Sequence, residues 1–319
     1  MADGAILLAE IVDAAKPAQV LREVHRTLDG IVGKEDLRRL DQVFVEVQRL
    51  FAGRYPGYSK CNTRYHDLEH TTDILLAMAR LIHGAVEAGR AIPRHMILLG
   101  LVSTLLHDTG YIQANDDREG TGAKFTAGHI FRSINFAREY LPPRGYSRAD
   151  YTVCRNALLC TGIDNRIAKI PFRTEDEALI GKMLGTSDLL GQMASCRYLE
   201  KLPHLYQELL EGEVLKHVSE YDFLENTAAF HQSTLDRFAG DLGGVYAYMR
   251  DHFRARWNID RDLYLEAIEE NITYLRSVLR SHPTDYLPLL KRREKGSKPA
   301  LPTGNIAFAR PGIGKSRDS

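Results

Sequence analysis

The sequence has no net charge, and it lacks both a long hydrophobic run and a secretory signal. Its 42 Lys and Arg residues balance 42 Asp and Glu residues, so the overall positive charge typical of a nucleic-acid-binding protein is missing. A zero net charge does not exclude a local basic patch. The longest uncharged apolar run, His95–His107, is shorter than the about 20 residues that cross a bilayer. The segment Met1–Lys16 has neither the basic start nor the extended apolar stretch of a signal peptide. We therefore expect a cytoplasmic protein without a membrane span and without nucleic acid as its partner.

The sequence also has little cysteine and lacks two motifs that would define a function class. Its four cysteines form no C-x-x-C pair, so we expect buried, reduced thiols rather than disulfides. A complete phosphate loop of the form G-x-x-x-x-G-K-[ST] is absent, which argues against that type of nucleotide site. No repeat of fixed period is present, which argues against a solenoid.

Apolar residues recur at three- and four-residue steps over most of the chain, and convincing alternation with a period of two is hard to find. This pattern predicts a compact all-α protein of roughly ten to thirteen helices and no sheet. Helix breaks are expected where Gly and Pro gather. The clearest apolar stripes lie within residues 37–51, 74–82, 130–141, 180–193 and 263–279.

The chain divides by composition into a main body and a basic end. Residues 291–319 carry 8 basic and 2 acidic residues, so the rest of the chain is acidic by the same margin. This end has little with which to build a core, and we expect a basic tail over 283–319. The remaining boundaries are expected to be an N-terminal helical extension, 1–34, and a main helical domain, 35–282, which carries the motifs described next.

Two segments carry residues suited to metal chemistry. In the first, His66, His70 and Asp73 stand at i, i+4 and i+7, so a single helix would place them on one face. In the second, His107 and Asp108 end a stretch that is uncharged from Ile97 to Leu106. An unpaired carboxylate at the rim of a core is costly, and a metal ion would relieve that cost. Taken singly, the His pair also fits ordinary polarity, and the His-Asp pair fits a simple turn of the chain.

A further carboxylate, Asp188, lies in an apolar helical pattern later in the chain. By itself it fits a helix cap as well as a ligand. With His70, His107 and Asp108 it completes a set of four ligands.

The order H-x-x-x-H, then H-D, then a distal D resembles that of the HD superfamily of metal-dependent phosphohydrolases. Within that superfamily, Tyr65-His66-x-x-x-His70-x-x-Asp73 is similar to the Y-H-N-x-x-H-A-x-D segment of the cyclic-nucleotide phosphodiesterase catalytic domain. The resemblance covers roughly residues 35–260 and implies an all-helical fold, in agreement with the periodicity.

The resemblance also implies roles for individual residues. His70, His107, Asp108 and Asp188 would bind a first metal, zinc or another transition ion. Asp108 would bridge to a second ion such as magnesium or manganese, and water activated between the two would attack phosphorus. His66 would protonate the departing oxygen.

Other positions are expected to have smaller roles. Asp73 would support a ligand histidine or simply pack its helix. His129, whose distance from Asp108 resembles that in other HD proteins, would bind the second metal or merely start a helix. Gln232 is a candidate for binding the base of a nucleotide. Departures from the phosphodiesterase pattern, Asp67 in place of Asn and Tyr111 in place of His, bear on the second metal and the substrate.

From this resemblance we expect a phosphohydrolase that acts on a small phosphoester, most simply a cyclic nucleotide. Two alternatives remain: a nucleotide phosphatase that cleaves a monoester or triphosphate, and a non-catalytic module that senses nucleotides and holds its metals structurally. The sequence defines no oligomeric state and is compatible with a dimer.

Overall fold

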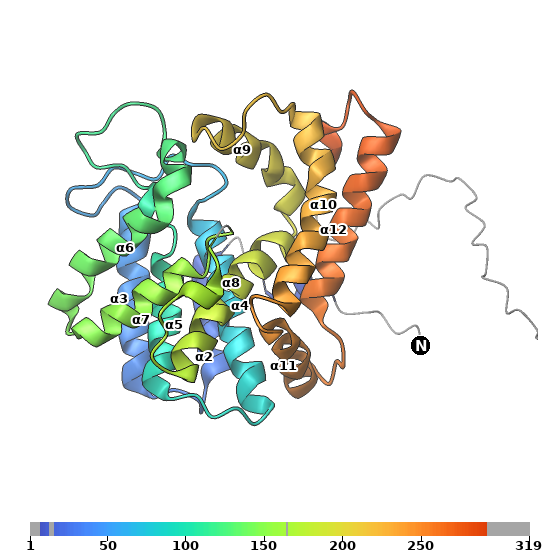
Figure 1. Ribbon diagram of the computed structural model, residues 1–319. Coiled ribbons are helices and arrows are strands. Elements are labelled where there is room, and N and C mark those ends of the chain that lie inside the picture. Colours follow the sequence, from blue (N-terminus) through green and yellow to red (C-terminus); the bar gives the residue numbers. More distant parts are fainter. Residues whose placement is uncertain (1–6, 13–15, 164, 292–319) are drawn as a thin grey trace, which may run out of the picture.

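The computed structural model describes residues 7–12, 16–163 and 165–291, and it is all-helical within them (Figure 1). This confirms the fold class and the expected number of helices. The twelve α-helices of the described residues are α1 (Leu8–Ile11), α2 (Pro17–Leu28), α3 (Lys34–Phe51), α4 (Leu68–Glu87), α5 (Arg94–Leu106), α6 (His129–Tyr140), α7 (Arg148–Leu159), α8 (Glu175–Ala194), α9 (Tyr198–Glu211), α10 (Glu220–Ala239), α11 (Tyr248–Trp257) and α12 (Leu263–Ser281).

Short 3₁₀ segments connect several of these helices, and the two nearest the histidine segments are η1 (Thr109–Tyr111) and η2 (Gly122–Gly128). The predicted apolar stripes lie in α3, α4, α6, α8 and α12, and the predicted Gly and Pro breaks lie between helices. No strand is present in the described residues; an isolated bridge between Tyr58 and Ala114 is the nearest approach to one.

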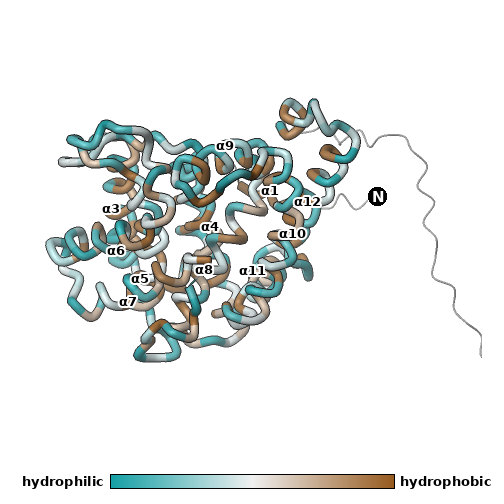
Figure 2. Tube along the Cα trace, turned by 45° about the horizontal axis from the view of Figure 1, so that its top comes forward, coloured by the Kyte–Doolittle hydropathy of each residue, from teal (hydrophilic) through white to brown (hydrophobic). Residues whose placement is uncertain are grey.

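The centre of the bundle is formed by α4, α5 and α8. Every residue of α4 from His70 to Ala85 is buried, and so is every residue of α5 from Ile97 to Leu106. A helix that is apolar around its whole circumference is stable only when other helices surround it. Figure 2 shows the hydrophobic stretches of these helices inside the bundle. The candidate ligands therefore begin or end helices of the core.

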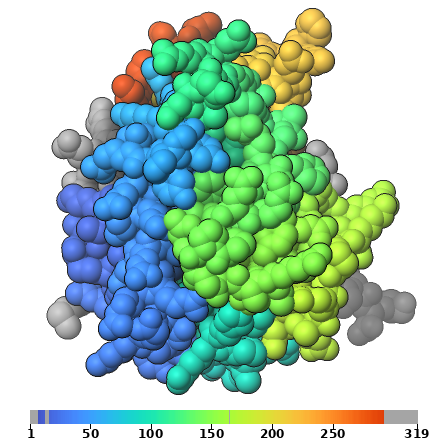
Figure 3. Space-filling view, turned by 90° about the vertical axis from the view of Figure 1, so that its left-hand side faces the viewer, coloured from blue at the N-terminus to red at the C-terminus, as the bar shows by residue number. Residues whose placement is uncertain are grey.

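Segments distant in sequence close one side of the bundle. Figure 3 shows the early helices beside the chain around residues 130–160 on this face. Glu46 on α3 accepts hydrogen bonds from the guanidinium of Arg144, at 2.6 Å and 3.0 Å, just after α6. The buried residues Val20, Val24 and Leu28 of α2 belong to the same hydrophobic core as α4. The basic tail expected over 283–319 falls mostly outside the described residues.

The four cysteines form no disulfide in the described residues, as expected, but they are not all buried. Cys154 and Cys160 lie in the core, whereas Cys61 is half-buried and Cys196 is exposed. Among the described helices, none combines the length and the apolar character needed to span a membrane.

Candidate metal centre

His66 lies outside the helix that the sequence predicted for it. The helix α4 begins at Leu68, and the preceding Asp67 is its N-cap, whose side chain accepts a hydrogen bond from the backbone N–H of His70 at 2.9 Å. The prediction that one helix carries His66, His70 and Asp73 is thus wrong for His66. Aspartate is favoured at this capping position because its carboxylate accepts a hydrogen bond from a backbone N–H group that would otherwise be unpaired. As a result, His66 approaches the site from a loop and His70 from the first turn of α4.

The other candidate ligands lie at a helix end and in a helix interior. His107 is the C-cap of α5, as predicted, and its Nδ1 lies 2.8 Å from the carbonyl oxygen of Thr104. That contact fixes the ring and leaves Nε2 free to face Asp108. Asp188 lies in the middle of α8, so the interpretation of this residue as a helix cap is wrong.

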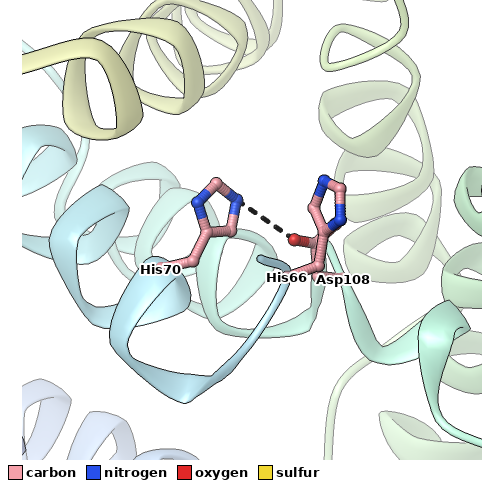
Figure 4. Close-up of side chains that lie close together, drawn as sticks. All are labelled: His66, His70 and Asp108. Atoms are coloured by element: carbon pink, nitrogen blue, oxygen red, sulfur yellow. Dashed lines mark ion pairs between the residues drawn. The ribbon is translucent and has the colours of Figure 1, made fainter. Parts of the chain in front are cut away.

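These side chains converge on one point. The Oδ2 atom of Asp108 lies 3.2 Å from Nε2 of His70 and 3.2 Å from Nε2 of His107. The Oδ1 atom of Asp188 lies 3.6 Å from His70 Nε2 and 3.9 Å from His107 Nε2. Figure 4 shows His70, on α4, directed at the Asp108 carboxylate, with His66 beside the pair. All four ligands implied by the resemblance are therefore together.

The chemistry of this group fits a divalent cation. His107 Nε2 and Asp108 Oδ2 are buried without a hydrogen-bond partner in the structure, which is the arrangement that an ion would satisfy. Ligands at about 2.1 Å from one ion in tetrahedral geometry lie about 3.4 Å apart. The four distances, from 3.2 Å to 3.9 Å, are close to that spacing.

The second oxygen of Asp108 faces another histidine. Its Oδ1 atom lies 3.9 Å from Nε2 of His129. His129 starts α6, and its Nδ1 lies 2.7 Å from the carbonyl oxygen of Thr126, so Nε2 points into the site. The structure confirms that His129 begins a helix and places it beside the Asp108 carboxylate, whereas binding of a second ion by His129 stays a prediction. No further histidine or carboxylate completes a second ligand group with His129 in the described residues.

A glutamate that the sequence did not single out, Glu208 on α9, holds His66. Its Oε2 atom lies 2.6 Å from Nδ1 of His66. Its Oε1 atom accepts hydrogen bonds from the backbone N–H groups of Arg64 and Tyr65, at 2.6 Å and 2.7 Å. One buried carboxylate therefore fixes both the ring of His66 and the loop that carries it.

Charge and burial set the protonation of these groups in opposite ways. Burial acts to lower the pKa of His66, but the hydrogen bond to Glu208 and the negative charges of Asp108, Glu208 and Asp188 together raise that pKa above its ordinary value. Burial likewise acts to lower the pKa of His107, and the charge of Asp108 raises it to about 9. His70, in contrast, has a pKa lowered by burial. His66 is thus the histidine held as a proton donor by a carboxylate that is not itself a candidate ligand.

Tyr111 lies between the two histidines on the more open side of the group. Its ring stacks on His66, with centroids 4.2 Å apart, and on His129, with centroids 4.6 Å apart. Its hydroxyl lies 3.5 Å from Nε2 of His66. The side chains of His66, Asp188 and His129 are 14%, 15% and 21% exposed, whereas that of His107 is 2% exposed, so the group is reached from the side that these three residues form.

Asp73 and Gln232 lie apart from this arrangement. Asp73 is buried one turn beyond His70 and faces Ser195 after α8, which favours a role in helix packing. Gln232 is exposed on α10 and donates a hydrogen bond to Asp236 at 3.3 Å. Its role in binding a base stays a prediction.

α9 makes two more polar contacts with the start of α4. Lys201 lies 2.9 Å from both carboxylate oxygens of Asp67, and Arg197 is paired with Glu69. In Figure 1 α9 lies across the top of the bundle. These ion pairs, together with Glu208, fasten α9 to the segment that carries His66 and His70.

No protein-family model matches the sequence, and searches of curated proteins and of solved structures likewise find no match.

Proposed function

We propose that this chain is a metal-dependent phosphohydrolase that cleaves a phosphodiester, with a cyclic nucleotide as the favoured substrate. The observation that carries the proposal is the position of Asp108, whose Oδ2 faces His70 and His107 and whose Oδ1 faces His129. A carboxylate in this position can serve two ions at once. The order of these residues in the sequence, which resembles that of the HD superfamily, supports the same assignment.

His70, His107, Asp108 and Asp188 would hold the first ion, zinc or another transition metal. Asp108 and His129 would contribute to a second ion, magnesium or manganese. When bound, such ions lower the pKa of water and neutralise charge on phosphoryl oxygens. The part of the chain before the basic tail is acidic, so an anionic substrate would be drawn by the ions rather than by the surface.

His66 supplies the proton in this proposal. Its Nδ1–H group donates to Glu208, which leaves Nε2 to carry a proton toward the departing oxygen of the substrate. Tyr111 holds the ring in place by stacking. Because the exposed edge of the group is formed by His66, His129 and Asp188, a phosphoester that enters there meets the proton donor beside the candidate ligands.

The test is a substrate panel on purified protein that has been stripped of metal and then given zinc, magnesium or manganese. We expect metal-dependent conversion of a cyclic mononucleotide to its monoester, and loss of conversion in His107→Ala and Asp108→Asn. Release of phosphate from mononucleotides, or cleavage of triphosphates, would instead support the nucleotide phosphatase. Bound metal without turnover of any member of the panel would support the non-catalytic module.

A further inference from the structure

A second group of buried polar side chains lies between α4 and α11. Arg80 and His83 of α4 are 1% and 8% exposed, and His252 of α11 is fully buried. The rings of His83 and His252 meet edge to face, with centroids 4.8 Å apart. The helices approach closely here because Gly84 has no side chain; a Cβ at this position would lie 1.8 Å from the carbonyl oxygen of Tyr248.

Most of the polar atoms in this group have no partner. Arg80 donates one hydrogen bond, from Nη1 to the hydroxyl of Tyr264 at 3.0 Å, while its Nε and Nη2 are buried without an acceptor. Both ring nitrogens of His252 and the Nδ1 of His83 are also buried and unpaired. A buried donor without a hydrogen-bond partner destabilises the fold, and more so when it is charged. At least three of these five nitrogens are donors, two on Arg80 and one on His252, because a neutral imidazole carries one N–H group, so acceptors are missing.

The charge of Arg80 is not neutralised by a carboxylate. No Asp or Glu oxygen lies within 4.0 Å of its guanidinium in the described part of the chain. The carboxylates on the surrounding elements are engaged or distant: Glu23 pairs with Arg256 at 2.9 Å, and the half-exposed Glu87 lies 3.9 Å from His83. Asp262, the N-cap of α12, accepts two backbone hydrogen bonds through Oδ1, and its buried Oδ2 has no hydrogen-bond partner and lies beyond ion-pair distance of Arg80.

The histidines contribute dipoles rather than charge. Burial lowers the pKa of His252 well below its ordinary value, and the neighbouring Arg80 lowers it further. Burial also lowers the pKa of His83. Neutral imidazoles each offer one N–H group, whereas arginine stays protonated in proteins. The group therefore presents one full positive charge and several N–H donors.

We propose that Arg80, His83 and His252 enclose a binding site for one small inorganic anion of the halide class. An anion supplies both the acceptor and the negative charge that these side chains lack. The contact between the two rings and the burial of all three side chains favour a monatomic ion over phosphate or a carboxylate. This site is independent of the proposed phosphohydrolase activity, since none of its residues is a candidate metal ligand.

Trp257 provides a direct readout, because it is the only tryptophan of the chain and its ring lies 5.3 Å from that of His252. In the test, sodium gluconate is replaced stepwise by sodium chloride at constant ionic strength, and tryptophan fluorescence and the melting temperature are measured at each step. We expect a saturable fluorescence change and a rise in melting temperature with chloride. Both should be absent in Arg80→Met and retained in His231→Phe, which removes a buried histidine from α10.

Crystals of the unsubstituted protein grown in sodium bromide keep the test independent of how the variant folds. An anomalous peak beside Nη2 of Arg80 and the ring of His252 is the expected result. A water molecule or no density at that point, or fluorescence and melting temperature that do not respond to chloride, would overturn the proposal.

Discussion

The Oε2 atom of Glu208 lies 2.6 Å from Nδ1 of His66, although 142 residues separate the two in the sequence. Both side chains are largely buried, at 5% and 14% exposure, so their interaction is weakly screened by solvent. Glu208 has a lowered pKa, because the bond to His66 and that residue's charge outweigh the effect of burial. The pair therefore stays charged over a wider pH range than either residue would alone.

The first prediction concerns Glu208→Gln. Without the carboxylate, the pKa of His66 should fall, since burial then acts on it with less opposition. A general acid works only while protonated, so the alkaline limb of the pH profile of kcat should move to lower pH. The pH profile of kcat and an NMR titration of His66 measure the shift. Glu211→Gln, one turn later on α9 and bonded to Thr121, is the matched control and should leave both unchanged. An unchanged His66 titration in Glu208→Gln would contradict the assignment.

The second prediction concerns metal binding. Asp108→Asn removes a charge from the carboxylate that faces three histidines, and we expect metal affinity to fall by more than about 100-fold. Metal analysis after dialysis and competition with a chelator measure the loss. Asp41→Asn is the control, because Asp41 also pairs with a histidine, His25, at 2.7 Å on the surface. Equal metal content in the two variants would exclude the proposed ligand set.

The third prediction concerns Asp73. Burial, and then the charge of Glu69, raises the pKa of Asp73 from 3.8 to about 7. The folded protein thus keeps a proton that the unfolded chain releases, so this group stabilises the fold below about pH 4 and that stability is lost as the pH rises to about 7. Asp73→Asn removes the ionisation. The variant should gain stability relative to the parent across this window, by at most about 1.4 kcal/mol per pH unit.

Denaturant unfolding of parent and variant between pH 4 and pH 8 gives this difference directly. Asp236→Asn makes the same chemical change at an exposed position of α10 and serves as control. If the free energy of unfolding varies with pH in the same way for Asp73→Asn and its parent, the pKa of Asp73 is not raised by folding and the prediction is wrong.

The fourth prediction compares two glycines near His129. A Cβ on Gly110 would lie 2.0 Å from the carbonyl oxygen of His129, whereas a Cβ on Gly128 would meet nothing within 4 Å. Gly110→Ala should push the start of α6 away from Asp108 and destabilise the fold by about 1–3 kcal/mol. Gly128→Ala should be tolerated. Thermal unfolding and the affinity for a second metal equivalent measure the effect, and similar values for both variants would argue against a tight approach at Gly110.

The helices could be predicted because their signals are local, whereas the grouping of His70, His107, Asp108 and Asp188 was expected from the resemblance in the order of these residues. The uncharged stretch from Ile97 to Leu106 marks a buried helix, and His107-Asp108 at its end marks a polar group that must be satisfied. The start of α4 was misplaced by two residues because periodicity alone does not show where Asp67 caps the helix. A capping aspartate before Leu68 was the available signal.

The roles of Glu208 and of the cluster formed by Arg80, His83 and His252 could not be predicted from the sequence in the same way. Glu208 lies among other acidic residues of α9, where a solvent-facing carboxylate is the ordinary interpretation, and its partner is far away in sequence. Arg80 and His252 come together only because Gly84 lets α11 approach α4. Such contacts depend on tertiary packing, which helical periodicity does not encode.

The order of these residues along the chain has a consequence for biosynthesis. Asp188, the last of the four candidate ligands, is made before Glu208, which follows 20 residues later on α9. A chain made only as far as α8 contains every candidate metal ligand and His66, but not the carboxylate that holds His66. Synthesis of α9 supplies that carboxylate, so the site lacks the residue that readies its proton donor until α9 has been made.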